Sequence, residues 1–177
     1  MDFLKMMQLE PHGPDTWIGE GPRYPWGGLY GGQIVAQGLR AASHSVDPTF
    51  RVHSLHAYFI RSGQHDAPVR YEVDRIRDGR SLVTRRVVAR QSTGAILNMS
   101  ASFQKPENEP AQQGLVVPVV HGADSSQNAS WTPFFERRPV QRIEPIPGDT
   151  SRTAWMRIQG ELPNEPLLHA CALAYMS

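Results

Sequence analysis

The side chains in this sequence best suited to acid–base chemistry are two histidines three positions apart, His53 and His56. An imidazole titrates near neutral pH and serves as a general acid or base. The apolar pattern predicts a strand over residues 52–61, and side chains alternate between the two faces of a strand. The two histidines therefore point to opposite faces and cannot share a metal ion. His53 lies on the apolar face, where we expect contact with substrate; the alternative is a core histidine whose hydrogen bonds are satisfied.

Two consecutive glycines, Gly31 and Gly32, begin a predicted helix that extends to about Ser43. The free N–H groups at a helix N-terminus bind anions and stabilise a developing oxyanion, and glycines let a ligand approach the backbone. The simpler interpretation is that the glycines allow close packing of the helix against the sheet. Tyr30 and Trp26, in the breaker-rich loop before the helix, either border an apolar channel or pack as an ordinary lid.

Arginines crowd two predicted strands, residues 69–77 and 82–91, and the turn between them. A guanidinium recognises a phosphate through paired hydrogen bonds, which makes Arg80 and Arg85 candidates for binding a phosphorylated ligand. The alternative is a solvated sheet face on which the arginines lie near acidic side chains. Between the strands, Asp78-Gly79 predicts a tight hairpin turn of type I′, because this pair tolerates positive φ values.

The elements that must position these residues form one helix and an antiparallel meander, which predicts an α+β domain whose sheet wraps an apolar helix. This first domain covers residues 1–104. Residues 105–130 are rich in Pro, Glu, Gln, Asn, Ser and Gly without a period, and they predict a linker. Residues 131–177 predict strand, strand and helix, which resembles the opening of the first half and indicates the start of a second domain.

The bulk composition favours a soluble globular protein, with 40% hydrophobic residues and a formal charge of +1. The arginines do not cluster as binding to nucleic acid requires, and no apolar run approaches the roughly 20 residues of a membrane span. The N-terminus lacks the basic start and apolar core of a secretory signal. The single cysteine, Cys171, lies in an apolar helical pattern, which predicts a reduced residue in the core. We therefore expect a cytoplasmic protein that binds neither nucleic acid nor membranes.

Several stretches of the chain resemble the acyl-CoA thioesterase II family, the double-hotdog thioesterases. The matching stretches, in the order and approximate spacing of the family, are residues 30–37, 52–63, 77–81, 85–87, 99–104, 155–157 and 168–177. The most specific are His-Ser-x-His-x-Tyr-Phe-x-Arg, which begins at His53, and the Arg-Asp-Gly-x-Ser turn, which begins at Arg77. The resemblance covers nearly the whole chain.

The resemblance implies a hotdog fold and hydrolysis of a fatty acyl-CoA to free acid and CoA, without a metal or redox cofactor. It implies a complete N-terminal hotdog followed by the first part of a second, which is a truncated double hotdog. The family's catalytic Asp, Thr or Ser, and Gln all belong to the second hotdog, and the Asp falls directly after the segment that matches 174–177. We therefore expect no catalytic residue within this chain and no activity of the chain alone.

The same resemblance makes acyl-CoA the expected ligand, and it leaves other functions open. The expected substrate-binding residues are Tyr30, Gly31, Gly32, His53, Arg80 and Arg85. One alternative is a non-catalytic acyl-binding or structural half that needs a partner chain. Another is a hotdog enoyl-CoA hydratase, which is disfavoured because the helix after Gly31 lacks the adjacent Asp and His of those enzymes. Hotdog proteins commonly pair through their sheets, so we also expect a homo-oligomer.

Overall fold

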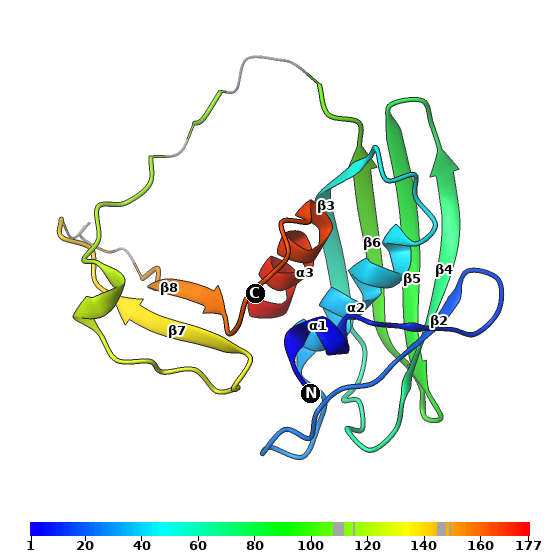
Figure 1. Cartoon of the computed structure of the whole chain (residues 1–177), viewed down its shortest axis with the longest axis horizontal. Coiled ribbons are helices and arrows are strands. Elements are labelled where there is room, and N and C mark those ends of the chain that lie inside the picture. Colours follow the sequence, from blue (N-terminus) through cyan, green and yellow to red (C-terminus); the bar gives the residue numbers. More distant parts are fainter. Residues whose placement is uncertain (108–111, 115, 145–147, 149) are drawn as a thin grey trace. The chain divides into compact units, whose positions relative to one another are not determined.

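A six-stranded antiparallel sheet wrapped around one long helix dominates the computed structural model, which describes residues 1–107, 112–114, 116–144, 148 and 150–177 (Figure 1). The elements in chain order are α1 (Phe3–Met6), β1 (Glu10–Pro11), β2 (Thr16–Gly19), α2 (Gly31–Ser43), β3 (Arg51–Phe59), β4 (Val69–Asp78), β5 (Leu82–Gln91), β6 (Gly94–Gln104), the 3-10 helix η1 (Ala123–Ser125), β7 (Phe135–Val140), β8 (Thr153–Ile158) and α3 (Pro166–Met176). The strand order of the sheet is β1-β2-β4-β5-β6-β3. This arrangement is the hotdog fold that the sequence predicts.

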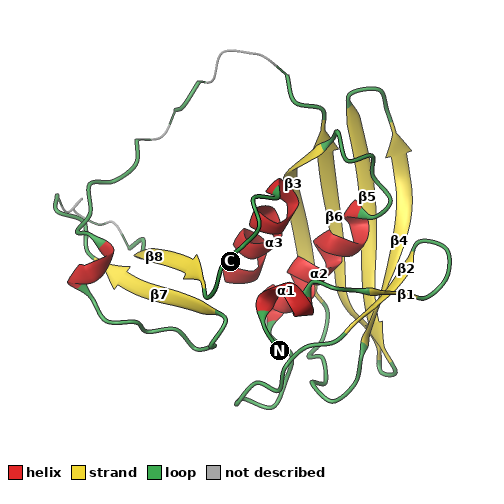
Figure 2. Cartoon of the chain, viewed as in Figure 1, coloured by secondary structure: helices red, strands yellow, loops and turns green. Residues whose placement is uncertain are grey.

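The central helix α2 is buried along nearly its whole length, and its bounds match the predicted helix. Its side chains Ile34 and Leu39 are 3% and 1% exposed and contribute to the core against the inner face of the sheet. A Cβ on Gly38 would lie 3.2 Å from the Met99 side chain, so the missing side chain lets helix and sheet approach closely. The helices α1, α2 and α3 lie on the same side of the sheet (Figure 2).

The hairpin between β4 and β5 forms where the sequence predicts it, but its geometry differs from a type I′ turn. Neither Asp78 nor Gly79 has a positive φ. The Gly79 N–H donates to the Leu82 carbonyl at 2.9 Å, and a Cβ on Gly79 would lie only 2.6 Å from that oxygen. Glycine is therefore required here by a close backbone approach, not by a left-handed conformation.

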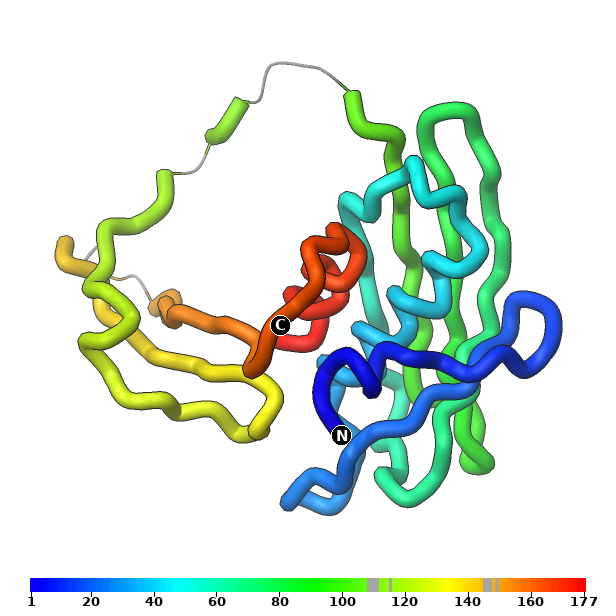
Figure 3. Tube along the Cα trace, in the orientation of Figure 1, coloured from blue at the N-terminus to red at the C-terminus, as the bar shows by residue number. Residues whose placement is uncertain are grey.

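The chain separates into two compact units, and one of them is discontinuous in sequence. The first unit comprises residues 1–107 and 162–177, because α3 packs against α2. The rings of Phe3 and Tyr175 are 5.7 Å apart, so the N-terminal segment, blue in Figure 3, lies beside the red α3. The predicted domain boundary at residue 131 stays a prediction, and α3 lies within the first compact unit.

The second unit, residues 108–161, is built on the antiparallel pair β7 and β8. On one face of this pair Phe135 is opposite Ile158, and both are buried. On the other face Glu136 accepts hydrogen bonds from Arg157 at 3.0 and 3.1 Å, and these bonds hold the pKa of Glu136 below its usual range. The predicted linker, residues 105–130, contains η1, and its residues 108–111 and 115 lie outside the described part.

The described part of the chain contains no helix that combines the length and apolar character needed to cross a membrane.

Candidate functional site

The start of α2 meets the end of α3, and both predicted glycines lie at this junction. A Cβ on Gly32 would lie 2.0 Å from the Tyr175 carbonyl oxygen, and one on Gly31 would lie 3.1 Å from the Phe59 ring. No side chain larger than hydrogen fits at Gly32 without displacement of α3. Close packing therefore explains the glycine at position 32, while Gly31 also lines a cleft on the surface.

A cleft of about 380 Å³ opens beside Gly31, at the end of β3 and the first turn of α2. Its lining residues are Leu29, Gly31, Ile34, Phe59, Ile60, Arg61, Ser62 and Gly63. The first N–H groups of a helix have no partner within the helix and carry the positive end of its dipole. The cleft thus combines apolar side chains, the first turn of a helix and a cationic side chain, Arg61. This set suits a ligand with an apolar chain and an anionic or carbonyl oxygen.

Sequence reasoning missed the contribution of Phe59, Arg61 and Ser62 to this cleft. All three lie in the stretch 52–63 that matches the family, in which only the histidines have side chains typical of acid–base chemistry. An arginine followed by Ser62-Gly63 directly after a strand was the available signal, since loop residues at strand ends often form sites. The Arg61 guanidinium also donates to the Thr93 carbonyl, which fixes its direction.

Tyr30 lies in an aromatic cluster at the same end of α2. Its ring is 5.0 Å from that of Tyr175 and 5.8 Å from that of Tyr24, while Tyr24 stacks on Trp26 at 4.8 Å. The hydroxyls of Tyr24 and Tyr175 are 3.1 Å apart. Burial and this contact raise the pKa of Tyr24 far above its usual value, so its hydroxyl stays protonated. Of the two alternatives for Tyr30, this geometry favours packing.

A buried polar network holds α2 to the surrounding segments. Gln37 is fully buried, and its amide Nε2 donates to the carbonyls of Met6 at 2.9 Å and Glu20 at 2.8 Å. Its Oε1 accepts from the Tyr71 hydroxyl at 2.7 Å and from Gln33 at 3.3 Å. These bonds tie the N-terminal arm, α2 and β4 together, so the network positions the helix whose first turn lines the cleft.

Arg85 is 1% exposed, and its guanidinium is fully engaged within the protein. It donates to Ser45 Oγ at 2.7 Å, to the Ser45 carbonyl at 2.9 Å, to the carbonyls of Arg77 and Thr84 at 3.0 Å each, and to the Asp78 carboxylate. This arrangement leaves no face of the guanidinium for a phosphate. We correct the predicted role: Arg85 joins the end of α2 to the β4–β5 hairpin.

The remaining predicted residues lie away from the cleft. Arg80 is exposed at the tip of the β4–β5 turn. His53 is exposed, and its Nε2 is 2.9 Å from Ser102 Oγ, on the face of β6 opposite to buried Ala101 and Phe103. The prediction that His53 shares the apolar face is wrong, because the register of β3 shifts between Val52 and Ser54 and turns His53 outward.

The described part of the chain does not assemble the side chains of a metal site. No three His, Cys, Asp or Glu side chains gather there as a metal site would require. Cys171 is fully buried, and burial raises the pKa of its thiol to about 12, which confirms it as a core residue and removes it as a nucleophile. What the described geometry supports is binding of an apolar ligand and donation of hydrogen bonds to an oxygen.

Comparison with known protein families finds two matches. Residues 21–104 match the family described as "Acyl-CoA thioesterase N-terminal domain", and residues 123–177 match "Acyl-CoA thioesterase". Among curated proteins, human acyl-coenzyme A thioesterase 8 is 42% identical over 97% of this chain and 63% of its own length.

Solved structures give the same result. An acyl-CoA thioesterase II from Mycobacterium marinum superposes with a TM-score of 0.84 at 35% identity, over 98% of this chain and 65% of that chain. A tesB protein from Mycobacterium avium subspecies paratuberculosis gives a TM-score of 0.81 at 31% identity, over 98% of this chain and 67% of that chain. This chain therefore spans about two thirds of the length of these relatives.

Proposed function

This chain belongs to the acyl-CoA thioesterase II family, and we propose on that basis that it binds a fatty acyl-CoA for hydrolysis to free fatty acid and CoA. The observation that carries the proposal is the cleft at the start of α2, where Gly31 in the first turn of the helix, Arg61 and Phe59 line one space. The thioester oxygen faces the first turn of α2 in this proposal, and the acyl chain lies on the apolar wall. An oxyanion donor of this kind contributes a factor of about 10²–10³ to a rate.

We further propose that the groups that activate water lie outside residues 1–177. Within α2 the sequence Gly-Gly-Gln-Ile-Val-Ala-Gln-Gly-Leu-Arg-Ala-Ala-Ser carries no Asp, Glu or His, so the helix offers no general base. In a chain that continues past Ser177, an Asp at position 178 would lie just beyond the end of α3. It would be three residues after Tyr175, whose carbonyl oxygen lies close to Gly32. That carboxylate would begin beside the first turn of α2.

An equilibrium titration tests the binding step without any need for catalysis. We expect a thioether analogue of decanoyl-CoA, which cannot be hydrolysed, to bind this chain with a heat signal that free CoA does not reproduce. Gly31→Val places a branched side chain against Phe59 and should weaken binding at least about tenfold, a loss of ~1.4 kcal/mol. Gly122→Ala adds a methyl group in open space in the other unit and is the matched control. Equal binding to both variants, or no binding to the chain, would refute the proposed cleft.

A second candidate is a non-catalytic acyl-binding half that works with a partner chain. Its support is the edge strand β3, which pairs with β6 and with no other strand among the described residues, and which exposes 65% of Tyr58 and 60% of Phe59. Unpaired strand edges promote association with another strand. Size-exclusion chromatography with light scattering distinguishes the cases: a monomer at all concentrations contradicts the predicted association through the sheets.

A further inference from the structure

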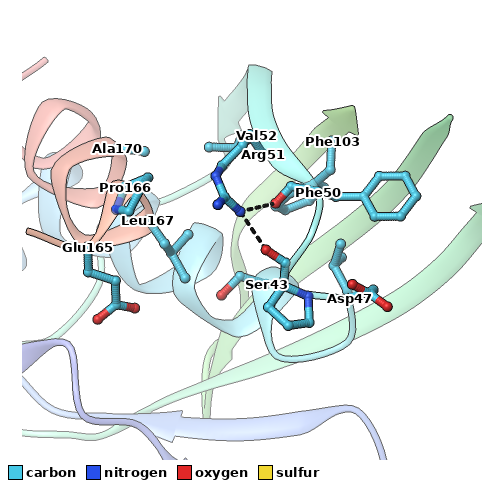
Figure 4. Close-up of a pocket in the computed structure, with 12 residues that line it drawn as sticks. Ser43, Asp47, Phe50, Arg51, Val52, Phe103, Glu165, Pro166, Leu167 and Ala170 are labelled. Carbon is cyan, nitrogen blue, oxygen red and sulfur yellow. Dashed lines mark hydrogen bonds between the residues drawn. The ribbon is translucent and has the colours of Figure 1, made fainter. Parts of the chain in front are cut away.

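A separate cavity lies at the opposite end of the two helices, where α2 ends and α3 begins (Figure 4). Its volume is about 310 Å³, within the range of small-molecule sites. The lining residues are Ser43, Val46, Asp47, Pro48, Phe50, Arg51, Val52, Phe103, Glu165, Pro166, Leu167 and Ala170. All of them belong to the first compact unit.

The walls of this cavity, which we name the distal cavity, are mostly apolar. Leu167 and Ala170 of α3 form one side, and Val52 of β3 and Phe103 of β6 form another (Figure 4). With a methylene taken at the ~30 Å³ that a water molecule occupies in the liquid, the volume accommodates about ten methylenes. A straight hydrocarbon chain of medium length therefore matches the space.

The charges at the cavity favour an anionic head group. Arg51 donates to the carbonyls of Pro48 and Phe50 and, among the described residues, forms no ion pair. The two acidic residues are already engaged: Asp47 accepts from the Thr49 N–H and hydroxyl at 2.8 and 2.6 Å, and Glu165 accepts from Arg40 at 3.3 Å.

A second cation lies close to this rim. Lys105 Nζ lies 5.3 Å from the centre of the Phe50 ring, and Phe50 lines the cavity. The charged groups around the cavity are therefore two cations, Arg51 and Lys105, and one anion, Asp47. The Arg40–Glu165 pair adds no net charge, so the sum is +1. A monoanionic ligand restores the balance.

We propose that the distal cavity binds a medium-chain fatty acid anion, with its carboxylate on Arg51 and its hydrocarbon chain between α3 and the ends of β3 and β6. The α2 helix separates this cavity from the cleft at Gly31 by about 18 Å, from twelve residues at 1.5 Å each. An acid held there is not at the thioester-binding end of the helix. The distal cavity is therefore a second site for the free acid, and it does not depend on the proposed hydrolysis.

Titration of decanoate into the chain, below the concentration at which the acid forms micelles, tests this site. Arg51→Gln keeps a polar side chain of similar reach without the charge and should weaken decanoate binding about tenfold, as expected for loss of one charged hydrogen bond. Methyl decanoate lacks the anion, so its weaker binding should not change in this variant. Arg86→Gln, on the outer face of the sheet, is the matched control and should bind decanoate as the unmodified chain does.

Ala170→Phe fills the cavity and should abolish binding of both the acid and the ester. If this variant does not fold by circular dichroism, methyl NMR shifts of Val46, Val52 and Leu167 on addition of decanoate replace it. Equal decanoate affinity in the Arg51→Gln variant, or shifts that avoid these three residues, would overturn the proposal, as would an absence of binding. Decanoyl-CoA thioether, added as a competitor, separates the sites: it should not displace decanoate.

Discussion

Replacement of Arg85 by methionine tests the structural role assigned to this buried guanidinium. Methionine has a similar length and apolar stem, so the variant removes hydrogen bonds more than volume. Of the five bonds, the one to Asp78 counts little, because the Asp78 side chain is 59% exposed and solvated. The other four end on Ser45 and on the carbonyls of Arg77 and Thr84, in an environment where Arg85 is 1% exposed.

Loss of a buried charged network costs about 3–5 kcal/mol, and we take about 3 kcal/mol because the variant leaves no buried charge without a partner, since the Asp78 carboxylate is solvated. For a domain of this size that loss lowers the melting temperature by about 6–12 °C. Urea denaturation followed by circular dichroism measures it, with Arg86→Met as the control on the adjacent, exposed position. If Arg85→Met lost less than about 1 kcal/mol while acyl-CoA binding fell, Arg85 would be a ligand residue and the structural reasoning would fail.

Three further perturbations follow from the same contacts. Gly32→Ala places a Cβ 2.0 Å from the Tyr175 carbonyl and should cost about 2–4 kcal/mol in urea denaturation, although alanine favours helices; a gain in stability would contradict the close approach. Tyr71→Phe removes the 2.7 Å hydrogen bond to Gln37 and should lower the free energy of unfolding by about 1 kcal/mol; an unchanged stability would contradict the network. Asp15 accepts paired bonds from Arg75 at 2.8 and 2.9 Å, which lower its pKa below the ordinary 3.8. The ion pair therefore contributes its full stability above pH 3.8, and this contribution is lost as the pH falls through the lowered pKa of Asp15. The difference in free energy of unfolding between the unmodified chain and the Asp15→Asn variant should close in acid. A difference that persisted there would refute the ion pair.

The elements with strong local signals were predictable from the sequence. The helix Gly31–Ser43 follows a loop rich in Gly and Pro and has apolar residues at helical spacing, and its observed bounds are those predicted. The β4–β5 hairpin also lies where Asp78-Gly79 indicates. In both cases a few adjacent residues determine the outcome, which is why sequence reasoning reached it.

The site residues depended on contacts between distant segments, and most of them were not predictable. The register shift in β3 that turns His53 outward has no local sequence signal, so simple alternation failed. Arg85 is satisfied by Ser45, Arg77 and Thr84, which only the folded sheet brings together with it. The contact of Phe59 with Gly31 likewise joins residues 28 positions apart.

The most direct test of the central claim is thiol release from decanoyl-CoA under single-turnover conditions, with this chain in excess. The claim is that residues 1–177 bind acyl-CoA at the start of α2 and do not supply the groups that activate water. The predicted result is retention of decanoyl-CoA by the chain on a filter, with thiol release at the rate seen in buffer alone. Thiol release by this chain above that rate, abolished by Gly31→Val, would contradict the claim that catalytic groups lie outside it.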